Sequence, residues 1–309
     1  MGNDTVVAVV PAFNPDADFV RRICRLMEQV SLVVVVDDGS DEARDWATQL
    51  SKLDRIFLIR QKNCGIASAI NRGVMQSLEL VPSAQFILTV DQDSELGEAY
   101  VRNAISTFEQ AKEDKVDVGA ICAEKFNDWS VAVRSVVKGH STALQVAQSG
   151  MLLPVDSIRA FGPFDERFFI DCVETDFIFR MLAGGYVVLR GDGCHMKHEV
   201  GNLTPVVVFG RAVHVGKKAL RFSYHSATRR YYITRNRVEL YRRYFWADPW
   251  WNLRDIILET RTLALCLIFG KARAAQAVSV VLGLTDGMAK RLGKIAPTRA
   301  ARLTGSKFR

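Results

Sequence analysis

Two carboxylates, Asp91 and Asp93, directly follow the apolar run from Phe86 to Val90. An unbroken apolar run of this kind is typical of a buried strand. Carboxylates at the end of such a strand repel each other, and a divalent cation would offset that repulsion. Mg2+ or Mn2+ would suit, because both take oxygen ligands and leave coordination positions open for substrate phosphates. The spacing therefore indicates a metal-diphosphate site, with a capped turn as the alternative.

The elements that would position these carboxylates alternate between apolar, strand-like runs and helix-like segments. Strands are predicted at 6–10, 32–36, 56–59 and 86–90, and helices at 16–29, 42–50 and 67–80. This alternation favours an α/β fold with a parallel sheet. In open sheets of this kind, ligands bind beyond the carboxyl ends of the strands. Three polar clusters lie at such ends, at residues 11–14, 37–40 and 91–94.

Length and composition limit the kind of molecule that could carry such a site. The chain has 309 residues, of which 49% are hydrophobic, so it can form one large domain or a domain with an appendage. Its six cysteines include no Cys-x-x-Cys pair, and a chain of this length does not need disulfides for stability. We therefore expect a reducing cytoplasm. No signal peptide is expected, because no apolar stretch precedes the first predicted strand.

Charge is divided unevenly along the chain. Residues 1–200 hold 20 Lys and Arg against 29 Asp and Glu, whereas residues 201–309 hold 21 against 5. Within this basic last third, tyrosines and tryptophans alternate with arginines between positions 229 and 251. That mixture is expected of a helix lying at a lipid headgroup layer. A helical appendage that packs its aromatic residues on the catalytic domain and points its arginines outward is an equal alternative, and binding of single-stranded RNA is a third.

The basic third contains no segment expected to span a membrane. Its most apolar stretch, residues 262–270, is too short to cross a bilayer, and Glu259, Arg261 and Lys271 flank it closely. We therefore expect peripheral attachment at most.

The motifs at the predicted strand ends occur in a fixed order. The first strand leads into Pro11-Ala12-Phe13-Asn14, the second into Asp37-Asp38-Gly39-Ser40, and the fourth into Asp91-Gln92-Asp93-Ser94. Residues 63–73 between them read Asn-Cys-Gly-Ile-Ala-Ser-Ala-Ile-Asn-Arg-Gly. This order resembles the GT-A fold glycosyltransferases of family 2, which are inverting enzymes that use nucleotide-sugar donors. The resemblance covers roughly residues 5–245, much more than a single strand-helix-strand motif.

The resemblance implies a fold and a domain division. Residues 1–225 would form a GT-A domain, a Rossmann-like nucleotide-diphospho-sugar transferase with a mostly parallel central sheet. Residues 226–309 would form a basic, aromatic-rich helical extension at the C-terminus.

The resemblance also implies which residues bind the donor. Asp38, or the adjacent Asp37, would hydrogen-bond the nucleobase or the ribose, with a simple capped turn as the alternative. Asn63 and Gly65 would shape the turn before a helix, where backbone N–H groups suit close approach to the donor. Arg72 would lie near the diphosphate. The predicted donor-binding set is Pro11, Phe13, Asn14, Asp37, Asp38, Asn63, Gly65, Arg72, Asp91 and Gln92.

The segment 161–176 resembles the acceptor-side region that supplies the catalytic base of these enzymes. Alignment on Asp176 and Arg180 puts Glu174 where the family usually has Asp. We predict Glu174 as the base, with Asp176 or Asp171 as alternatives, because a carboxylate can take the proton of an acceptor hydroxyl. These acids could instead cap the following helix, which is our interpretation of Asp171.

A histidine of the family corresponds to His198, which follows Glu174 by 24 residues. As a neutral imidazole, His198 would complete the Mg2+ or Mn2+ site begun by Asp93 and Asp91. We interpret His195 as structural. A weaker alternative, because the spacing is irregular and only one Cys adjoins the histidines, is a zinc cluster of Cys172, Cys194, His195 and His198.

Residues 91–94, 168–171 and 229–236 resemble those of bacterial rhamnosyltransferases that build O-antigen or other cell-surface polysaccharide. Related galactofuranosyltransferases share several of these features. The resemblance implies dTDP-L-rhamnose as the donor, with UDP-galactofuranose or another UDP-sugar as the alternative. The acceptor would be a saccharide or a polyprenyl-diphosphate-linked sugar at the inner face of the bacterial plasma membrane, and the basic last third would serve it.

Two other function classes stay open. The chain could be a catalytically inactive, nucleotide-sugar-binding partner subunit, because Glu174 replaces the usual Asp. A basic tail that binds RNA would predict salt-sensitive RNA retention without sugar transfer; we expect no nucleic-acid partner. Aromatic-rich helices often form interfaces, so the last third could also support a homo-oligomer.

Overall fold

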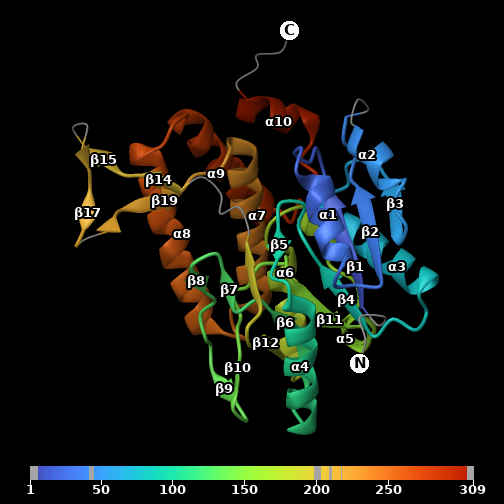
Figure 1. Ribbon diagram of the computed structural model, residues 1–309. Coiled ribbons are helices and arrows are strands. Elements are labelled where there is room, and N and C mark those ends of the chain that lie inside the picture. Colours follow the sequence, from blue (N-terminus) through green and yellow to red (C-terminus); the bar gives the residue numbers. More distant parts are fainter. Residues whose placement is uncertain (1–5, 42–44, 198–202, 209–210, 217, 305–309) are drawn as a thin grey trace. The chain divides into compact units, whose positions relative to one another are not determined.

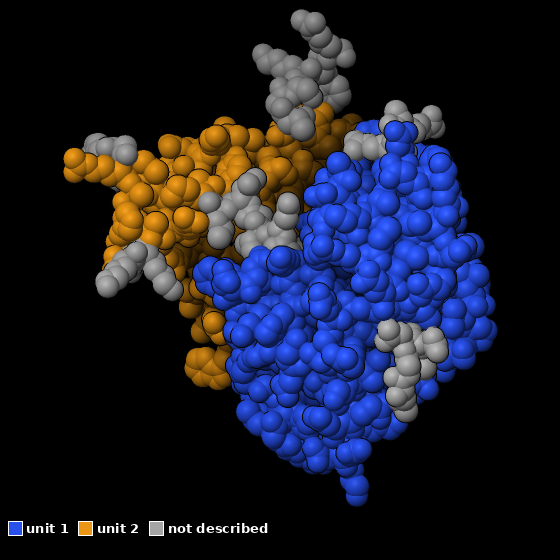
Figure 2. Space-filling view, in the orientation of Figure 1, with its two compact units in different colours: residues 1–166, 173–199 blue, residues 167–172, 200–309 orange. Residues whose placement is uncertain are grey.

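The structure, a computed structural model, describes residues 6–41, 45–197, 203–208, 211–216 and 218–304. The chain divides into two compact units, which Figure 2 shows in different colours. Unit 1 comprises residues 1–166 and 173–199, and unit 2 comprises residues 167–172 and 200–309. Unit 2 therefore includes a short segment, 167–172, that comes from the middle of the sequence of unit 1.

Unit 1 is built on a seven-stranded mixed sheet (Figure 1). One strand, β11, runs antiparallel to both of its neighbours, β4 and β6, and the other neighbouring strands pair in parallel. The order along the sheet is β12 (Val187–Arg190), β6 (Val118–Cys122), β11 (Met151–Pro154), β4 (Phe86–Thr89), β1 (Val6–Ala12), β2 (Leu32–Asp37) and β3 (Ile56–Arg60).

The central strands are buried on both faces. Every residue in 6–10 and 33–36 is at most 1% exposed, and Val9 pairs with Val34 on one side and Thr89 on the other. Because both faces are covered, apolar side chains are needed at every position, which explains the unbroken valine runs. The helices of unit 1 are α1 (Phe19–Met27), α2 (Asp45–Leu50), α3 (Ile66–Leu80), α4 (Tyr100–Glu113), α5 (Val155–Phe161) and α6 (Val173–Ala183).

Smaller pairings fix the chain beyond the main sheet. A four-stranded sheet has the order β5 (Glu95–Leu96), β13 (His195–Lys197), β7 (Lys125–Phe126) and β8 (Trp129–Ser130). A separate antiparallel pair joins β9 (Val136–Val137) and β10 (His140–Ser141). Because β5 begins directly after Ser94, the four-stranded sheet holds the chain that leaves the predicted metal site.

The structure confirms the predicted α/β fold with a mostly parallel central sheet. Element ends differ by a few residues from the sequence prediction, as is common at fraying ends. The helix predicted at 16–29 spans 19–27, and the strand predicted at 86–90 ends at Thr89. The helix predicted at 42–50 is described from Asp45 onward, and residues 42–44 lie outside the described part of the chain.

Unit 2 combines helices with short antiparallel strand pairs. A 3-10 helix, Glu166–Phe168, leads into its first segment, and the N-cap of α7 is Ser226, at the predicted start of the C-terminal extension. The helices are α7 (Ala227–Tyr244), α8 (Pro249–Phe269), α9 (Arg273–Met288) and α10 (Pro297–Thr304). The strand pairs are β14 (Leu203–Pro205) with β19 (Arg221–Ser223), β15 (Val207–Val208) with β16 (Arg211–Ala212), and β17 (His214–Val215) with β18 (Lys218–Ala219).

Helix α9 approaches α7 closely through glycines. A Cβ on Gly283 would lie 2.9 Å from the carbonyl oxygen of Tyr231, and a Cβ on Gly287 would lie 2.9 Å from the carbonyl oxygen of Arg235. Any side chain at these positions would push the two helices apart. The close packing brings the Tyr231 hydroxyl within 2.8 Å of an oxygen of Asp286. Burial, and then this hydrogen bond, raise the pKa of Tyr231 to about 12.

Several aromatic and basic residues of α7 lie inside unit 2. Arg230 and Arg235 are 1% exposed, and Tyr231 and Tyr232 are also buried. The Arg235 guanidinium lies 4.9 Å from the ring centroid of Tyr232, within cation–π distance. The prediction that these residues lie at a headgroup layer is therefore wrong for these four. The helical-appendage alternative, with its arginines pointing outward, is also wrong for Arg230 and Arg235, because both are buried inside unit 2. Among the described helices, none is long and apolar enough to cross a membrane.

Unit 2 carries a histidine that should make its stability depend on pH. Burial, and then the cationic Arg229, lower the pKa of His225 to about 4; Asp171 opposes this shift, and Arg230 and Arg237 add to it. The unfolded chain, with a histidine pKa of about 6.5, binds more protons across this interval. The contribution of His225 to stability is therefore fully present above about pH 6.5 and is lost as pH falls toward 4.

We expect His225→Gln to flatten this acid loss of stability, measured by thermal unfolding at pH values from about 4.5 to about 7.5. His214→Gln, at an exposed histidine of the same unit, serves as the control. An equally steep acid loss in the His225→Gln protein would contradict the assignment.

Candidate active site

The carboxyl ends of β1, β2 and β4 meet at one edge of the sheet, as their parallel pairing requires. We call the segments 11–14, 37–41, 61–65 and 91–94, which lie at or beside this edge, the rim. The end of β1 is in register with the end of β2, with Pro11 beside Val36 and Ala12 beside Asp37. The three polar clusters predicted at strand ends thus follow neighbouring strands.

Asn14 fastens the end of β1 to the loop after β2. Its backbone N–H donates to Oγ of Ser40 at 2.8 Å, and its side-chain Oδ1 accepts from the N–H of Asp41 at 3.1 Å. Asn14 adopts a φ of 48°, a left-handed conformation that asparagine tolerates better than most residues. The asparagine predicted for donor binding therefore also shapes the loop.

Asp38 fastens the end of β2 to the turn before α3. One carboxylate oxygen accepts from the N–H of Cys64 and from Nε2 of Gln61, and the other accepts from the N–H of Gly65, each at 2.8 Å. Gly65 is the N-cap of α3, so these N–H groups lie at a helix N-terminus, where a negative charge is favourable. The Asp38 carboxylate is itself only 6% exposed.

Glycine is required beside Asp38. Gly39 has a φ of 86°, and a Cβ there would lie 2.7 Å from the backbone nitrogen of Asn63. Any other residue would combine an unfavourable backbone conformation with a collision against the 61–65 segment. The glycine of the Asp-Asp-Gly-Ser motif is therefore explained by the close approach of two rim segments.

Asp37 is held inside its own loop. It is 3% exposed; one of its oxygens accepts from the N–H of Ser40 at 2.9 Å, and the other lies 3.2 Å from Nε of Arg60. Arg60 also donates to the carbonyl oxygen of Ser40 at 2.8 Å. These bonds are those of the capped turn that the sequence allowed as an alternative. A contact between either acid and the donor stays a prediction.

Gln92 links the ends of β1 and β4. Its Oε1 accepts from the N–H of Phe13 at 2.7 Å, and its Nε2 donates to the carbonyl oxygen of Phe13 at 3.2 Å. Nε of Arg22, on α1, donates to the backbone carbonyl oxygen of Gln92 at 2.8 Å. The backbone of Phe13 is thereby fixed, while its ring remains 47% exposed.

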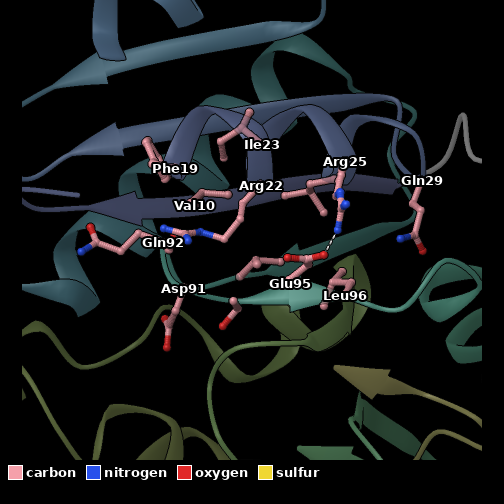
Figure 3. A pocket seen from close by; sticks show the side chains of 13 residues that line it. Val10, Phe19, Arg22, Ile23, Arg25, Gln29, Asp91, Gln92, Glu95 and Leu96 are labelled. Carbon is pink, nitrogen blue, oxygen red and sulfur yellow. Dashed lines mark hydrogen bonds and ion pairs between the residues drawn. The ribbon is translucent and has the colours of Figure 1, made fainter. Parts of the chain in front are cut away.

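A small pocket adjoins this link, between α1 and the segment 90–96 (Figure 3). Arg25 of α1 pairs with Glu95 across it. Asp91 and Gln92 contribute to its lining, and Figure 3 shows the Asp91 carboxylate directed away from α1. The lining comes mainly from α1 and the segment 90–96, and it includes neither Asp93, Asp38 nor Glu174. The pocket is therefore beside the rim and does not mark the predicted donor site.

Asp91 and Asp93 follow β4 at the rim. The N–H of Asp91 donates to Oγ of Ser149 at 2.9 Å, and that hydroxyl donates to Oγ of Ser94 at 2.7 Å. One oxygen of each aspartate, Oδ1, is buried from solvent. Two carboxylates with partly buried oxygens form a hard donor set, which fits Mg2+ or Mn2+.

The protein ligands for such an ion are few. Within the described ranges, no group of three or more His, Cys, Asp or Glu side chains could hold a metal ion. One or two carboxylates are enough for Mg2+ when substrate phosphates and water supply the other ligands. The predicted third ligand, His198, lies outside the described residues.

His195, the first residue of β13, and the adjacent Cys194 are both engaged in contacts that stabilise the fold. Nε2 of His195 lies 3.2 Å from a carboxylate oxygen of Glu124, which also accepts from the N–H of Gly193. The Cys194 thiol is fully buried, and burial raises its pKa well above the ordinary value, so it favours the neutral thiol over a metal-binding thiolate. These contacts favour the structural interpretation of His195.

Glu174 and Asp176 both lie in the first turn of α6. Asp176 is 0% exposed, and one of its oxygens accepts from Nε of Arg180 at 3.1 Å. Glu174 is partly exposed, with one oxygen 3.3 Å from Oγ1 of Thr175. A base must reach the hydroxyl that it deprotonates. Exposure therefore favours Glu174 over Asp176 as the base.

The residues just before α6 belong to unit 2 and form a strained loop. Phe169, Asp171 and Cys172 have φ values of 65°, 64° and 66°, which are uncommon for residues other than glycine. Asn236, which is fully buried, lies with Nδ2 within 2.7–2.9 Å of the carbonyl oxygens of Phe168, Ile170 and Asp171.

The side chain of Asp171 in this 168–172 loop is also held by α7. Nη2 of Arg229 donates to Oδ1 of Asp171 at 3.0 Å, and Nε of Arg229 lies 3.3 Å from both oxygens. The segments 168–171 and 229–236, which the sequence singled out separately, are therefore bonded to each other. The carboxylate of Asp171 is thus bonded to Arg229, and its predicted role as the cap of the following helix stays a prediction.

Two neighbouring residues of α3, Asn71 and Arg72, differ in their contacts. Arg72 is exposed on α3 and takes no part in the rim bonds described above. Asn71, its neighbour, exchanges hydrogen bonds with the backbone N–H and carbonyl of Phe164 at 2.9 Å. Sequence reasoning missed Gln61 within the rim, and it missed three side chains that bond to the rim from elsewhere in the chain, because no motif marks them: Arg22, Arg60 and Ser149.

Comparisons with known proteins identify the family. The model of glycosyl transferase family 2 matches residues 7–151, which contain the whole rim. The dTDP-rhamnosyl transferase RfbF of Shigella flexneri is 30% identical over 281 residues, which cover 86% of this chain and 87% of the relative. The chain belongs to glycosyl transferase family 2. In open α/β sheets, ligands bind beyond the carboxyl ends of the strands, so the rim of this glycosyltransferase is where a donor site is expected.

Solved structures show the fold of this glycosyltransferase. The crystal structure of S. aureus TarS matches with a TM-score of 0.51 and 13% identity, over 96% of this chain and 50% of TarS. The chain thus spans half the length of that TarS chain. TarS 1–349 in complex with UDP-GlcNAc matches with a TM-score of 0.49 and 14% identity, over 97% of this chain and 79% of that one. The first likeness, together with the family, shows a GT-A fold.

The bonds of Asp38 predict a cost for its removal. Asp38→Ala would leave the N–H groups of Cys64 and Gly65 without their acceptor, so we expect a loss of about 1–3 kcal/mol in the free energy of unfolding. Denaturant unfolding measures this. Asp156→Ala, at a side chain that is 93% exposed, is the control and should change stability by less than about 0.5 kcal/mol. Equal effects of the two substitutions would argue against the Asp38 anchor.

The 168–172 loop should loosen when its anchor is removed. Asn236→Ala takes away the side-chain donor of one buried and two partly buried carbonyl groups, so we expect faster amide hydrogen exchange in residues 168–174 and a loss of about 1–3 kcal/mol in the free energy of unfolding. Thr260→Ala, at an exposed position of α8, is the control. Unchanged exchange in this loop would show that the backbone holds its conformation without Asn236.

Proposed function

We propose that this glycosyltransferase transfers L-rhamnose from dTDP-L-rhamnose to a hydroxyl of a saccharide, free or linked to a polyprenyl diphosphate, with inversion at the anomeric carbon. The similarity to a dTDP-rhamnosyl transferase supports this, because it covers 86% of the chain and therefore extends across both units. The mutual bonds of segments 168–171 and 229–236 add support, since both segments resemble rhamnosyltransferases.

The rim would bind the nucleoside diphosphate. The exposed ring of Phe13 offers an apolar face to the nucleobase, and the Gln92 link holds its backbone in place. Asn14 and Asn63 would border the same nucleoside, and Arg72, exposed on α3, would bring a positive charge toward the diphosphate. Pro11, Asp37, Asp38 and Gly65 would act mainly by fixing the loops around the donor.

Asp93 and Asp91, together with His198, would hold Mg2+ or Mn2+ next to the diphosphate. When bound, such an ion neutralises the charge that develops on the leaving nucleoside diphosphate. The two aspartates lie where β4 ends, so the sheet itself sets their position.

Glu174 would act as the catalytic base. It would remove the proton of the acceptor hydroxyl as that oxygen attacks the anomeric carbon, while the bond from this carbon to the diphosphate breaks and its electron pair leaves with dTDP. The transition state resembles an oxocarbenium ion, and a single displacement requires one base and no protein nucleophile. Asp176, buried against Arg180, would keep α6 in place.

We infer that the reaction takes place in the cytoplasm, at the inner face of a bacterial plasma membrane, where a lipid-linked acceptor would be found. The excess of basic residues in 201–309 supports a location beside anionic groups.

The proposal is tested by assaying purified protein with dTDP-L-rhamnose, UDP-galactofuranose, UDP-glucose and UDP-galactose, each with Mn2+ or with EDTA. We expect metal-dependent turnover of dTDP-L-rhamnose, lowered by about 10²- to 10⁴-fold in Glu174→Gln and abolished in Asp93→Ala. Asp54→Asn, at an exposed acid on the surface of unit 1, is the matched control.

Each other outcome would point to a specific alternative. Turnover of UDP-galactofuranose alone would change the donor but keep the mechanism. Activity that survives Glu174→Gln would move the base to Asp176 or Asp171. No binding or turnover of any donor with either treatment would favour an inactive, nucleotide-sugar-binding partner subunit.

A further inference from the structure

Helix α8 of unit 2 presents large apolar side chains to solvent. Trp250 is 81% exposed, Ile257 is 59% exposed and Ile268 is 56% exposed, and Leu253 is also exposed. These positions recur at spacings close to the helical period, so they form one continuous face. The helix has 21 residues, and the face therefore runs for about 30 Å. Exposed apolar surfaces of this extent usually mark a site of interaction.

The opposite face of α8 lies inside unit 2; it is polar in the first half of the helix and apolar near the C-terminus, where Cys266 packs in a cluster with Val206 and Phe222. Asn252 is fully buried and donates to the carbonyl oxygens of Tyr244 and Asp248. Asp255 is 3% exposed and pairs with Arg237 at 2.8 Å. A surface helix normally buries its apolar side and exposes its polar side. In the first half of α8 this arrangement is reversed, so an apolar environment outside the protein is needed to explain it.

Helix α9 shows the same reversal. Val281 and Met288 are 59% and 69% exposed, and Val278 and Leu284 are exposed as well. Apart from Val280, its buried positions carry small or polar residues, namely Gln276, Ser279, Gly283, Asp286 and Gly287. Two consecutive helices therefore direct their apolar residues outward, which argues against a chance pattern on either one.

The acids of unit 2 are already used inside it. Among residues 203–304 that the structure describes, every Asp and Glu has a basic partner or caps a helix: Glu239 with Arg242 and Arg243, Asp255 with Arg237, Glu259 with Arg230 and Arg237, Asp286 with Arg291 and Arg299, and Asp248 at the N-cap of α8. Little negative charge is thus left to balance the exposed arginines and lysines.

Basic residues accompany both apolar faces. Arg254 and Arg261 are exposed on α8. Arg254 follows Trp250 by four residues, and Arg261 follows Ile257 by four, so each arginine lies next to an apolar side chain of this face. Lys271 and Lys290 are exposed near the two ends of α9. Apolar side chains flanked by cations, with tryptophan among them, match the boundary between headgroups and acyl chains of an anionic bilayer.

We propose that the exposed faces of α8 and α9 bind the surface of an anionic membrane, with the apolar side chains entering the headgroup layer and the arginines contacting lipid phosphates. A second copy of this chain fits less well, because a self-complementary contact would bring the same basic residues together. RNA would satisfy the arginines but would leave the aliphatic side chains without a partner. The inference builds on the proposed function only in that a lipid-linked acceptor would lie at the same surface.

The test is sedimentation of the full chain with vesicles of phosphatidylcholine alone or with phosphatidylglycerol added. We expect binding to the anionic vesicles, weakened by salt, and little binding to the neutral ones. Trp250→Ser combined with Ile257→Ser should lower the partition coefficient by at least about tenfold, and Arg254→Glu combined with Arg261→Glu should do the same. Met75→Ser, which has the same 59% exposure as Ile257 but lies on α3, is the matched control.

Circular dichroism and donor hydrolysis in the absence of vesicles should match the native chain for each variant. Equal binding of the native and substituted chains, or equal binding to both vesicle types, would overturn the proposal. So would a native oligomer, measured by light scattering, that Trp250→Ser with Ile257→Ser converts to a monomer while vesicle binding is absent. Vesicle binding without turnover of any donor would refute the proposed function and leave this surface intact, and turnover without vesicle binding would do the reverse.

Discussion

The carboxylate of Asp38 is the interaction on which the architecture of the rim depends. A buried anion at the end of β2 needs strong donors, and the N–H groups of Cys64 and Gly65 supply them at the start of α3. This bond fixes where α3 begins relative to the sheet. Asn14 then ties β1 to the same loop, and Gln92 ties β1 to β4. With so many polar groups engaged among themselves, the exposed ring of Phe13 stands out as a surface that the donor can contact.

Sequence patterns predicted the strands and the rim correctly where burial and backbone geometry restrict the residue type. Valine runs predicted the central strands because both faces of the sheet are covered, and the order of polar clusters predicted the rim because parallel strands end at one edge. Contacts between distant segments could not be predicted in this way. Nothing in the local pattern indicates that Asn236 bonds the carbonyl groups of Phe168 and Asp171, or that Asn71 bonds the backbone of Phe164. Such bonds depend on packing rather than on periodicity.

Unit 2 shows why composition and burial must be considered together. Its surplus of basic residues suggested a surface of mixed aromatic and arginine side chains, yet Arg230 and Arg235 are buried and bond inside the unit. Glu259 pairs with Arg230, whereas Arg235 is held by the Asn236 side chain and by backbone carbonyl oxygens. The consequence is indirect: because acids are drawn inward to neutralise buried arginines, exposed cations such as Arg254 remain outside with apolar neighbours. The same constraint that stabilises the interior therefore sets the character of the surface.

The 168–172 loop belongs to unit 2 and directly precedes α6 in the sequence. Left-handed conformations at Phe169, Asp171 and Cys172 cost on the order of 1–3 kcal/mol each, and they persist only where surrounding contacts over-determine them. Asn236 and Arg229 provide such contacts, both from α7. Cys172 is followed directly by α6, and Glu174 lies in the first turn of that helix. The strained loop is therefore separated by one residue in sequence from the proposed base, although the two belong to different units.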